Sequence, residues 1–212
     1  MDPAKFLETL RQQRAIAILR APHMHLGVGM AQAAAAGGVR LIEVTWNSDR
    51  PAQLVDHLRQ ALPHCWIGVG TVRSMADLKA AVAAGADFGF SPYTDPDLLR
   101  WATDQQWPLV PGALTPSEIG AAWRAGAPAV KVFPVGALGG PSYLRSLSAP
   151  LGHIPLVPTG GLTVDQASMM LQAGATAVGL STGLFPMTAV AQQDWDTITR
   201  LAQHLMAVCR EA

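Results

Sequence analysis

Residues 125–134 read AGAPAVKVFP, and this stretch indicates how the whole chain is built. The run from Ala129 to Pro134 is short, apolar and rich in β-branched and aromatic residues, which is typical of a buried strand. Lys131 lies in its middle and is one of only three lysines in the sequence. A lysine withdrawn from water loses the stabilisation of its charge, so a neutral amine becomes available as a nucleophile. The alternative is a lysine that reaches out to solvent from the end of a strand.

The same arrangement repeats along the chain, because short apolar runs alternate with helical segments. Four helices end in an Ala-Gly pair that leads into the next strand, at residues 36–39, 84–87, 125–128 and 173–176. Glycine accepts the left-handed conformation that ends a helix, so the repeated Ala-Gly pair indicates a repeated strand–helix unit. We expect a leading helix at 2–13, strands at 15–19, 41–46, 66–71, 88–92, 109–112, 129–134, 156–159 and 177–181, and helices at 25–36, 51–62, 74–84, 95–104, 116–125, 141–147, 164–173 and 192–210.

Eight strands, each followed by a helix, predict an α/β fold in which the parallel strands close into a ring. The specific expectation is a (β/α)8 TIM barrel with an extra N-terminal helix that covers the N-terminal mouth of the barrel. No linker rich in Gly, Ser or Pro divides the chain, so we expect residues 1–212 to form a single domain. An open doubly wound sheet is the alternative fold.

Composition narrows the functional classes. The chain has 212 residues, of which 50% are apolar, and its formal net charge is zero. This composition excludes disorder and argues against nucleic acid as the main partner, so a small-molecule partner is expected. The N-terminus lacks the apolar core of a signal peptide and no run is long enough to span a bilayer, so we expect no membrane partner and a cytoplasmic protein. Cys65 and Cys209 are expected to be reduced and buried.

An acid and an amine are expected to converge inside the barrel. Alternation along 41–46 places Glu43 and Thr45 on the face opposite the apolar side chains, which must pack under the helices. The same argument turns Lys131 and Phe133 inward. Both strands are even-numbered, and inward side chains of alternate strands share a layer in this fold. We interpret Glu43 and Lys131 as a catalytic pair; the alternative is a structural ion pair, which contributes little stability.

Glycine-rich segments follow the last two strands. One strand ends in Thr159-Gly160-Gly161 and the other in Ser181-Thr182-Gly183. The loops at these two positions commonly bind phosphate in a (β/α)8 barrel. Glycines allow backbone N–H groups to approach an anion, and hydroxyl groups add donors. Tight turns also require glycine, so the position of these segments is the stronger argument.

Six motifs in register, between Ala15 and Pro186, resemble the bacterial 2-keto-3-deoxy-6-phosphogluconate / 4-hydroxy-2-oxoglutarate aldolases. They are Glu43-Val44-Thr45, Gly70-Thr71-Val72, Ser91-Pro92, Val110-Pro111-Gly112, Lys131-Val132-Phe133-Pro134 and Pro158-Thr159-Gly160-Gly161. The resemblance implies a class I aldolase, a homotrimer of barrels with no metal and no cofactor. It implies that Lys131 forms the Schiff base and that Glu43 is the acid/base. It also implies a pyruvate pocket of Thr71, Pro92, Phe133 and Thr159, and a phosphate site of Gly160, Gly161 and Thr182, with Ser181 beside it.

One position departs from the gluconate-type enzymes. Their carboxylate-binding arginine is usually two residues after the threonine of the ExT motif, where this chain has Asn47. The related phosphogalactonate aldolases are similar to this chain in having asparagine there and an arginine at the end of the first strand. Arg20 fits that pattern, and its planar guanidinium suits two-point binding of a carboxylate. The alternative is that Arg20 is a loop charge. The sequence therefore does not decide whether the substrate is of the gluconate, galactonate or hydroxy-oxoglutarate type.

The resemblance implies cleavage of a 2-keto-3-deoxy-6-phospho sugar acid to pyruvate and glyceraldehyde 3-phosphate, or of 4-hydroxy-2-oxoglutarate to pyruvate and glyoxylate. A metal-dependent aldolase is an alternative, because His23 and His25 are close in the sequence. Metal sites need three or four ligands, however, and Glu43 is the only candidate for a third ligand beside the two histidines. A phosphate-binding barrel without turnover and an isomerase on the same scaffold are further alternatives.

Overall fold

Strands and helices alternate along the chain, and the computed structural model describes all residues from 1 to 212. The strands are β1 (Ala15–Leu19), β2 (Leu41–Thr45), β3 (Trp66–Gly70), β4 (Gly89–Phe90), β5 (Leu109–Val110), β6 (Gly112–Ala113), β7 (Val130–Val132), β8 (Leu156–Pro158) and β9 (Val178–Leu180). The helices are α1 (Pro3–Gln13), α2 (Met24–Ala36), α3 (Pro51–Ala61), α4 (Met75–Ala83), α5 (Pro96–Asp104), α6 (Pro116–Arg124), the 3-10 helix η1 (Gly136–Leu138), α7 (Pro141–Leu151), α8 (Gln166–Gln172), α9 (Met187–Gln192) and α10 (Trp195–Glu211).

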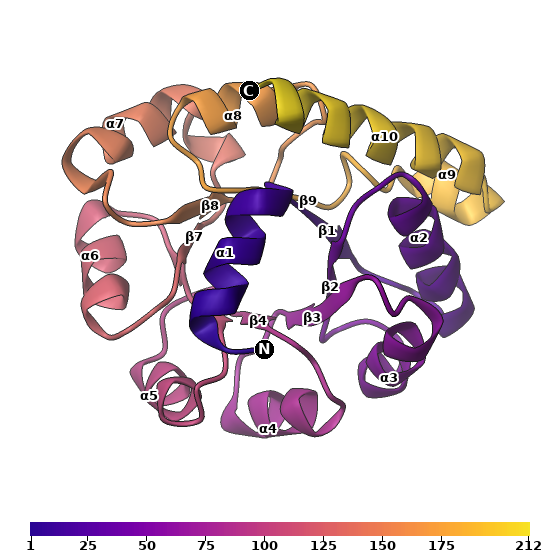
Figure 1. The fold of residues 1–212 in the computed structure, drawn as a ribbon, viewed down its shortest axis with the longest axis horizontal. Helices are drawn as coiled ribbons and strands as arrows, with labels where there is room; N and C mark the ends of the chain where they lie inside the picture. Colours follow the sequence, from indigo (N-terminus) through magenta and orange to yellow (C-terminus); the bar gives the residue numbers. More distant parts are fainter.

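All paired strands are parallel, and they form a curled sheet with helices around its outside (Figure 1). The ladder is divided into a six-stranded sheet of order β5-β4-β3-β2-β1-β9 and a three-stranded sheet of order β6-β7-β8. The single strand expected at 109–112 is therefore wrong in detail. Pro111 separates β5 from β6, because proline has no N–H to donate to a ladder. Its carbonyl still accepts a hydrogen bond from the N–H of Lys131 at 2.9 Å.

The sheets approach each other again between β8 and β9. Thr159 and Gly179 form an isolated parallel bridge, and the N–H of Thr176 donates to the carbonyl of Leu156 at 2.9 Å. The ring of eight strands expected from the sequence is thus present as an alternating α/β fold with a curled parallel sheet, without a continuous ladder. The helix expected at 192–210 is present as α10, three residues later at its start; the short α9 before it was not expected, and it is followed by Gln193 in the left-handed conformation.

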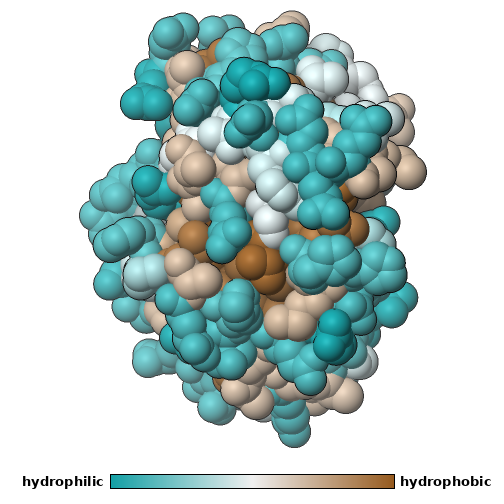
Figure 2. Space-filling view, turned by 90° about the vertical axis from the view of Figure 1, so that its right-hand side faces the viewer, coloured by the Kyte–Doolittle hydropathy of each residue, from teal (hydrophilic) through white to brown (hydrophobic).

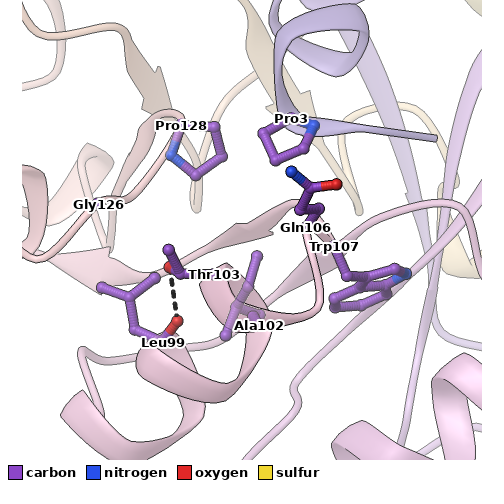
Figure 3. A pocket seen from close by; sticks show the side chains of 9 residues that line it. Pro3, Leu99, Ala102, Thr103, Gln106, Trp107, Gly126 and Pro128 are labelled. Atoms are coloured by element: carbon purple, nitrogen blue, oxygen red, sulfur yellow. Dashed lines mark hydrogen bonds between the residues drawn. The ribbon is translucent and has the colours of Figure 1, made fainter.

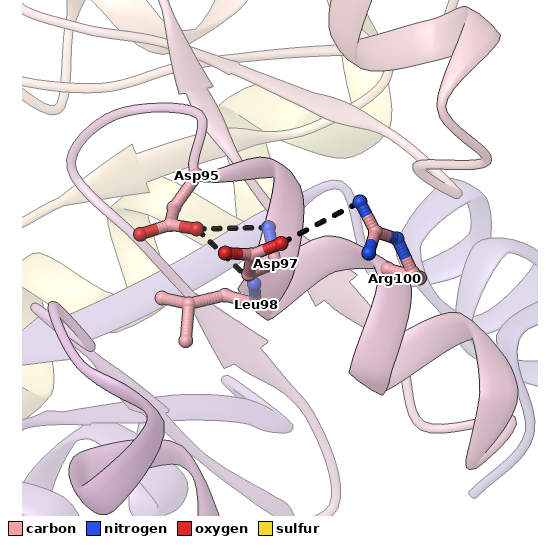
Figure 4. A network of polar contacts seen from close by, with 4 residues as sticks. All are labelled: Asp95, Asp97, Leu98 and Arg100. Carbon is pink, nitrogen blue, oxygen red and sulfur yellow. Dashed lines mark hydrogen bonds and ion pairs between the residues drawn. The ribbon is translucent and has the colours of Figure 1, made fainter.

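Local sequence explains where the helices begin. Figure 4 shows the start of α5, where Asp95 Oδ1 accepts hydrogen bonds from the N–H groups of Asp97 at 2.9 Å and Leu98 at 3.2 Å. These are donors that have no partner inside the helix, so the cap stabilises its first turn. Arg100 lies 3.5 Å from Asp97, one turn away on the exposed side. Figure 2 shows one outer face, on which hydrophilic side chains surround an apolar band.

Two hydrophobic cores lie on opposite sides of the sheet. The larger one packs the outward strand residues, such as Ile42 and Val44, under the helices. The smaller one fills the inside of the curled sheet with eleven side chains: Phe6, Leu10, Ile16, Ile18, Leu41, Phe88, Phe90, Val110, Ala129, Val157 and Ala177. Phe6 and Leu10 belong to α1, which crosses the amino-terminal ends of the strands (Figure 1). The expected role of the leading helix is thereby confirmed. No helix combines the length and the apolar character needed to cross a membrane.

Candidate active site

Lys131 points into the curled sheet from β7. Its neighbours Val130 and Val132 belong to the outer core, so the alternation of the strand turns the lysine inward. The residue is only 7% exposed, which rules out the alternative of a lysine extended into solvent. Its Nζ lies 5.2 Å from the ring centroid of Phe133 and 5.7 Å from that of Phe90. The ion pairs of the chain involve other residues, so this buried amine has no direct counter-ion.

Glu43 points into the same interior from β2 and is 1% exposed. Neither carboxylate oxygen accepts a hydrogen bond from the protein. Burial raises the pKa of the Glu43 carboxyl above its ordinary value, and the positive charges of Lys131 and Arg20 oppose this shift. The expected convergence of acid and amine is therefore supported by their electrostatic coupling, while a directly bonded ion pair is not formed. A buried acid without partners is costly for stability and is characteristic of a group kept for chemistry.

Gly70 makes room for the Glu43 carboxylate. It ends β3, the strand beside β2, and a Cβ atom at this position would overlap Oε1 of Glu43. Thr71 follows it with a positive φ of 60°, which is strained for a β-branched residue. Such strain is held in place by the surrounding structure, and it gives Thr71 a fixed position next to the acid.

Arg20 lies at the carboxyl end of β1, at the mouth of the curled sheet, and is exposed. The loop after β2 holds the backbone next to it: Ser48 Oγ accepts a hydrogen bond from the N–H of Ala21 at 3.0 Å, and the N–H of Asp49 donates to the carbonyl of Ala21 at 2.9 Å. The positive charge of Arg20 opposes the rise that burial causes in the pKa of the Glu43 carboxyl. Asn47 is exposed in the same loop. The structure thus brings both expected carboxylate-binding residues to the mouth.

Two of the four residues expected to bind pyruvate border one cavity. Pro92 and Phe133 line a hollow of about 260 Å³ that continues over Tyr93, Thr94 and Leu114. The Phe133 ring is 37% exposed, so one part of it faces the lysine and another part faces solvent. This cavity lies at the carboxyl ends of the strands, where a (β/α)8 enzyme carries its active site.

Thr159 completes the expected pyruvate set from β8. It is buried, and its Oγ1 contacts only the carbonyl of Val157, at a long distance of 3.4 Å. Its backbone forms the bridge to Gly179, so Thr159 lies where the two sheets approach each other. The hydroxyl is therefore held at the inner surface with most of its hydrogen-bonding capacity free.

The two glycine-rich loops lie side by side. A Cβ on Gly183 would meet the backbone of Leu162 and Thr163, so the loop after β9 contacts the loop after β8. Gly160 and Gly161 have positive φ values of 92° and 75°. The backbone N–H groups of these two glycines donate no hydrogen bond within the chain. Successive free N–H groups in such a loop form a concave site for an anion.

The loop after β9 supplies the other expected phosphate residues. Ser181 and Thr182 begin a single turn in which the N–H of Phe185 donates to the carbonyl of Ser181 at 2.8 Å. The N–H of Thr182 donates to no group of the chain, and its side chain is exposed. The four residues expected to bind phosphate therefore come together at one edge of the mouth.

A second cavity, of about 210 Å³, lies at the opposite end of the sheet. Its walls come from the start of α1, from α5 and from the turns before β5 and β7, with Pro3, Thr103 and Trp107 among them (Figure 3). None of the expected site residues lines it. His23 and His25 stack with their ring centroids 5.8 Å apart, and no third His, Cys, Asp or Glu joins them in a group that could hold a metal ion.

Sequence reasoning missed three residues of this region. Phe90 lies beside the lysine, Gly70 makes room for the acid, and Ser48 holds the backbone next to Arg20. Alternation along 88–92 was a signal for Phe90, because it faces the same way as Phe88 into the interior. No pattern in the sequence points to Ser48, whose partner is 27 residues away.

Comparison with known proteins agrees with this geometry. The sequence model of the KDPG and KHG aldolase family matches residues 7–201. The 2-dehydro-3-deoxy-phosphogluconate aldolase of Pseudomonas aeruginosa is 35% identical over 178 residues, which are 84% of this chain and 80% of the relative. The KHG/KDPG aldolase of Escherichia coli K12 is 33% identical over 83% of each chain. A crystal structure of the KDPG aldolase of Legionella pneumophila, with pyruvate captured at low pH as a covalent carbinolamine, matches with a TM-score of 0.88 at 27% identity, over 97% of this chain and 98% of that one. This chain therefore belongs to the KDPG and KHG aldolase family and is an aldolase.

Proposed function

We propose that the chain is a class I aldolase that cleaves a 2-keto-3-deoxy-6-phospho sugar acid. The observation that carries this proposal is the pair of buried, inward-facing groups Lys131 and Glu43. The positive charge of Lys131 opposes the rise that burial causes in the pKa of the Glu43 carboxyl, and neither group is bonded to a protein partner. A structural ion pair would hold its members in direct contact. Groups that are not in direct contact with each other stay free to act on a ketone carbon and a hydroxyl group of the substrate.

The reaction begins when the nitrogen lone pair of Lys131 attacks the C2 carbonyl of the keto acid. Glu43, whose protonated form is favoured by burial, gives a proton to the resulting hydroxyl group, so water leaves and an iminium ion and a Glu43 carboxylate remain. The iminium nitrogen withdraws electrons from the C3–C4 bond. Glu43 accepts the proton of the C4 hydroxyl, the C3–C4 bond breaks, and the electron pair moves into an enamine. Glu43 returns the proton to C3, and water releases pyruvate from the lysine. The raised pKa of Glu43 suits a group that must both accept and donate a proton.

Two groups of residues at the mouth support the choice of substrate. After β8 and β9, the free N–H groups of Gly160, Gly161 and Thr182 suit a phosphate, with Ser181 beside them. After β1 and β2, the strands that follow β9 in the sheet, Arg20 and Asn47 suit the carboxylate of the keto acid. The aldehyde product is then glyceraldehyde 3-phosphate. We also propose activity on 4-hydroxy-2-oxoglutarate, which yields pyruvate and glyoxylate, because one curated relative is named for both substrates.

The pyruvate pocket of the proposal consists of Thr71, Pro92, Phe133 and Thr159. All four lie at the carboxyl ends of their strands, around the position of Lys131. The captured carbinolamine in the Legionella structure supports covalent capture of pyruvate as the chemistry of this family site. No step of the proposed reaction requires a metal or a cofactor.

The proposal includes the architecture. We infer that residues 1–212 form one domain and that the two sheets together act as a (β/α)8 barrel, because one inner core joins residues of α1 with residues from β1 to β9. We propose a homotrimer, as the family resemblance implies, and sedimentation analysis tests it. Exposed Tyr93, Leu138 and Met187 offer apolar surface for such contacts. The free thiols of Cys65 and Cys209 support a reducing compartment, the cytoplasm.

Reductive trapping tests the function directly. Borohydride added with pyruvate is expected to attach the three-carbon unit to Lys131 and to no other lysine, as peptide mass spectrometry reads out. Lys131→Ala is expected to abolish both trapping and cleavage. Modification at Lys5 or Lys79 instead of Lys131 would overturn the assignment. An isomerase or a binding protein has no need of an amine that condenses with ketones, so the absence of any trapped lysine would favour those alternatives.

A further inference from the structure

The buried amine lies between two aromatic rings. Lys131 Nζ is 5.7 Å above the ring centroid of Phe90 and 5.2 Å above that of Phe133. Both distances fall within the range in which a cation is attracted to the face of an aromatic ring. Phe133 belongs to the motif of the lysine itself, whereas Phe90 comes from β4 and is almost completely buried.

The site must carry a positive charge at one stage of the reaction. An amine, a ketone and one proton combine to give an iminium ion and one water, so a positive charge is fixed on the Lys131 nitrogen. Water cannot solvate this cation well, because Lys131 is 7% exposed. Glu43 is ionised at this stage, because it next accepts the C4 hydroxyl proton, but its carboxylate oxygens bond to no group of the protein and so do not contact the Lys131 nitrogen. Arg20 carries a charge of the same sign as the iminium and opposes it.

We propose that the face of the Phe90 ring stabilises the iminium cation on Lys131, acting together with Phe133. Phe90 is thus a further catalytic residue of the aldolase reaction, since its ring contacts the reacting nitrogen. This inference rests on the Schiff-base chemistry proposed above. Enamine formation removes the positive charge, so the stabilisation applies to iminium formation and is lost during cleavage of the carbon–carbon bond.

The N-terminal helix fixes the orientation of this ring. Phe90 packs edge-on against Phe88, with centroids 5.9 Å apart and an interplanar angle of 84°. Phe6 of α1 lies 5.2 Å from Phe88 and 6.5 Å from Phe90. The three rings pack against one another as a cluster, and Phe90 turns the face of its ring toward Lys131. The ring is therefore held in position before substrate arrives, which is the condition for electrostatic stabilisation without reorganisation.

The test measures how much pyruvate is needed for half-maximal borohydride trapping at Lys131, at one fixed pH. Phe90 is replaced by mono-, di- and trifluorophenylalanine, which weaken the negative ring face in steps at nearly constant volume, and also by leucine. Phe88→Leu is the matched control. It removes an equally buried ring of the same aromatic cluster, and this ring makes no cation–π contact with the lysine. Circular dichroism checks that each variant is folded.

We expect the half-maximal pyruvate concentration to rise with each added fluorine and to reach about tenfold for Phe90→Leu, with Phe88→Leu within about twofold of the unaltered chain. A flat fluorine series would overturn the inference, and so would an equal loss in both leucine variants, since packing alone would then explain the effect. The two proposals fail differently: no trapping in the unaltered chain refutes the Schiff-base chemistry and this inference with it, whereas normal trapping with a flat series refutes only the role of Phe90.

Discussion

Replacing Glu43 with glutamine is expected to make the chain more stable and nearly inactive. The carboxylate is buried and neither of its oxygens has a protein partner, so its charge is poorly compensated in the folded state. Glutamine keeps the shape of the side chain and removes the charge. A buried polar group without a partner costs about 1–3 kcal/mol, and more when it is charged. The attraction of Lys131 and Arg20 for the carboxylate offsets part of that cost, so we expect a gain of about 1–2 kcal/mol at pH 8.

The expected stabilisation depends on pH, and the sign follows from the pKa. The pKa of Glu43 is raised by burial, so the folded chain binds this proton more tightly than the unfolded chain does. The protonated carboxyl stabilises the folded chain fully when the pH is below the pKa that Glu43 has in the unfolded chain. This stabilisation is lost as the pH rises through the higher pKa that Glu43 has in the folded chain. The advantage of Glu43→Gln is therefore largest at pH 8 and small near pH 4.5, where the native carboxyl is also neutral.

Thermal unfolding at the two pH values measures this effect. For a chain of this length 1 kcal/mol corresponds to about 2–4 °C, so Glu43→Gln is expected to unfold about 2–8 °C higher at pH 8. Turnover is expected to fall by a factor of about 10²–10⁴, the usual contribution of a general acid–base. Glu118→Gln is the control: the N–H groups of Thr115 and Leu114 bond to Glu118 and lower its pKa, so its removal destabilises at pH 8, and this loss disappears only as the pH falls below 4.5 through the lowered folded pKa. An equal gap at both pH values, or a less stable Glu43→Gln at pH 8, would refute the reasoning.

Three further substitutions test the mouth and the floor of the site. Arg20→Ala is expected to raise KM for the keto acid in steady-state assays, because the cation at the end of β1 is lost; an unchanged KM removes Arg20 from the site. Thr182→Glu adds a negative charge beside the free N–H groups and is expected to raise KM about tenfold for phosphorylated substrates. It is expected to leave 4-hydroxy-2-oxoglutarate unaffected, and Thr103→Glu, at the opposite end, serves as its control; equal effects on both substrates contradict a phosphate site there. Phe6→Ala removes a fully buried ring and is expected to cost about 3–5 kcal/mol in urea unfolding, whereas a cost below about 1 kcal/mol would mean that α1 does not support the inner core.

The inward direction of the two central residues could be predicted because it depends on a local rule. In β2 and β7 the neighbours of Glu43 and Lys131 are Ile and Val, which must pack under the helices, so alternation leaves only one direction for the acid and the amine. The positions of the strands followed from the same patterns. The Ala-Gly pairs placed the ends of four helices correctly. The glycine of the pair is left-handed at Gly85, Gly126 and Gly174, and after α2 the left-handed residue is Gly38, one position beyond the pair.

Other features arise where two segments meet in the fold, so they could not be predicted from the sequence of either segment alone. The break at Pro111 divides the ladder because the hydrogen bonds of two neighbouring strands meet there, whereas the sequence of 109–112 alone looks continuous. The contact of Phe90 with Lys131 joins β4 and β7, whose separation across the interior depends on the curvature of the sheet. The separate helix α9 ends at Gln193, a left-handed residue that is not glycine, so no sequence signal marked the break between α9 and α10.

The placement of α1 has a consequence for how the protein is made. Phe6 and Leu10 belong to the same inner cluster as Val157 and Ala177, which lie more than two-thirds of the way along the chain. Ribosomes add about 5–20 residues each second, so the first helix emerges well before the strands that cover its apolar side. During that interval Phe6 and Leu10 have only part of the inner core to pack against, because Ile16, Ile18 and Leu41 are made soon after them and Val157 and Ala177 much later. The contacts of α1 are thus complete only when the end of the sheet has been made, and a chain released early, without β8 and β9, lacks part of the surface on which this helix docks.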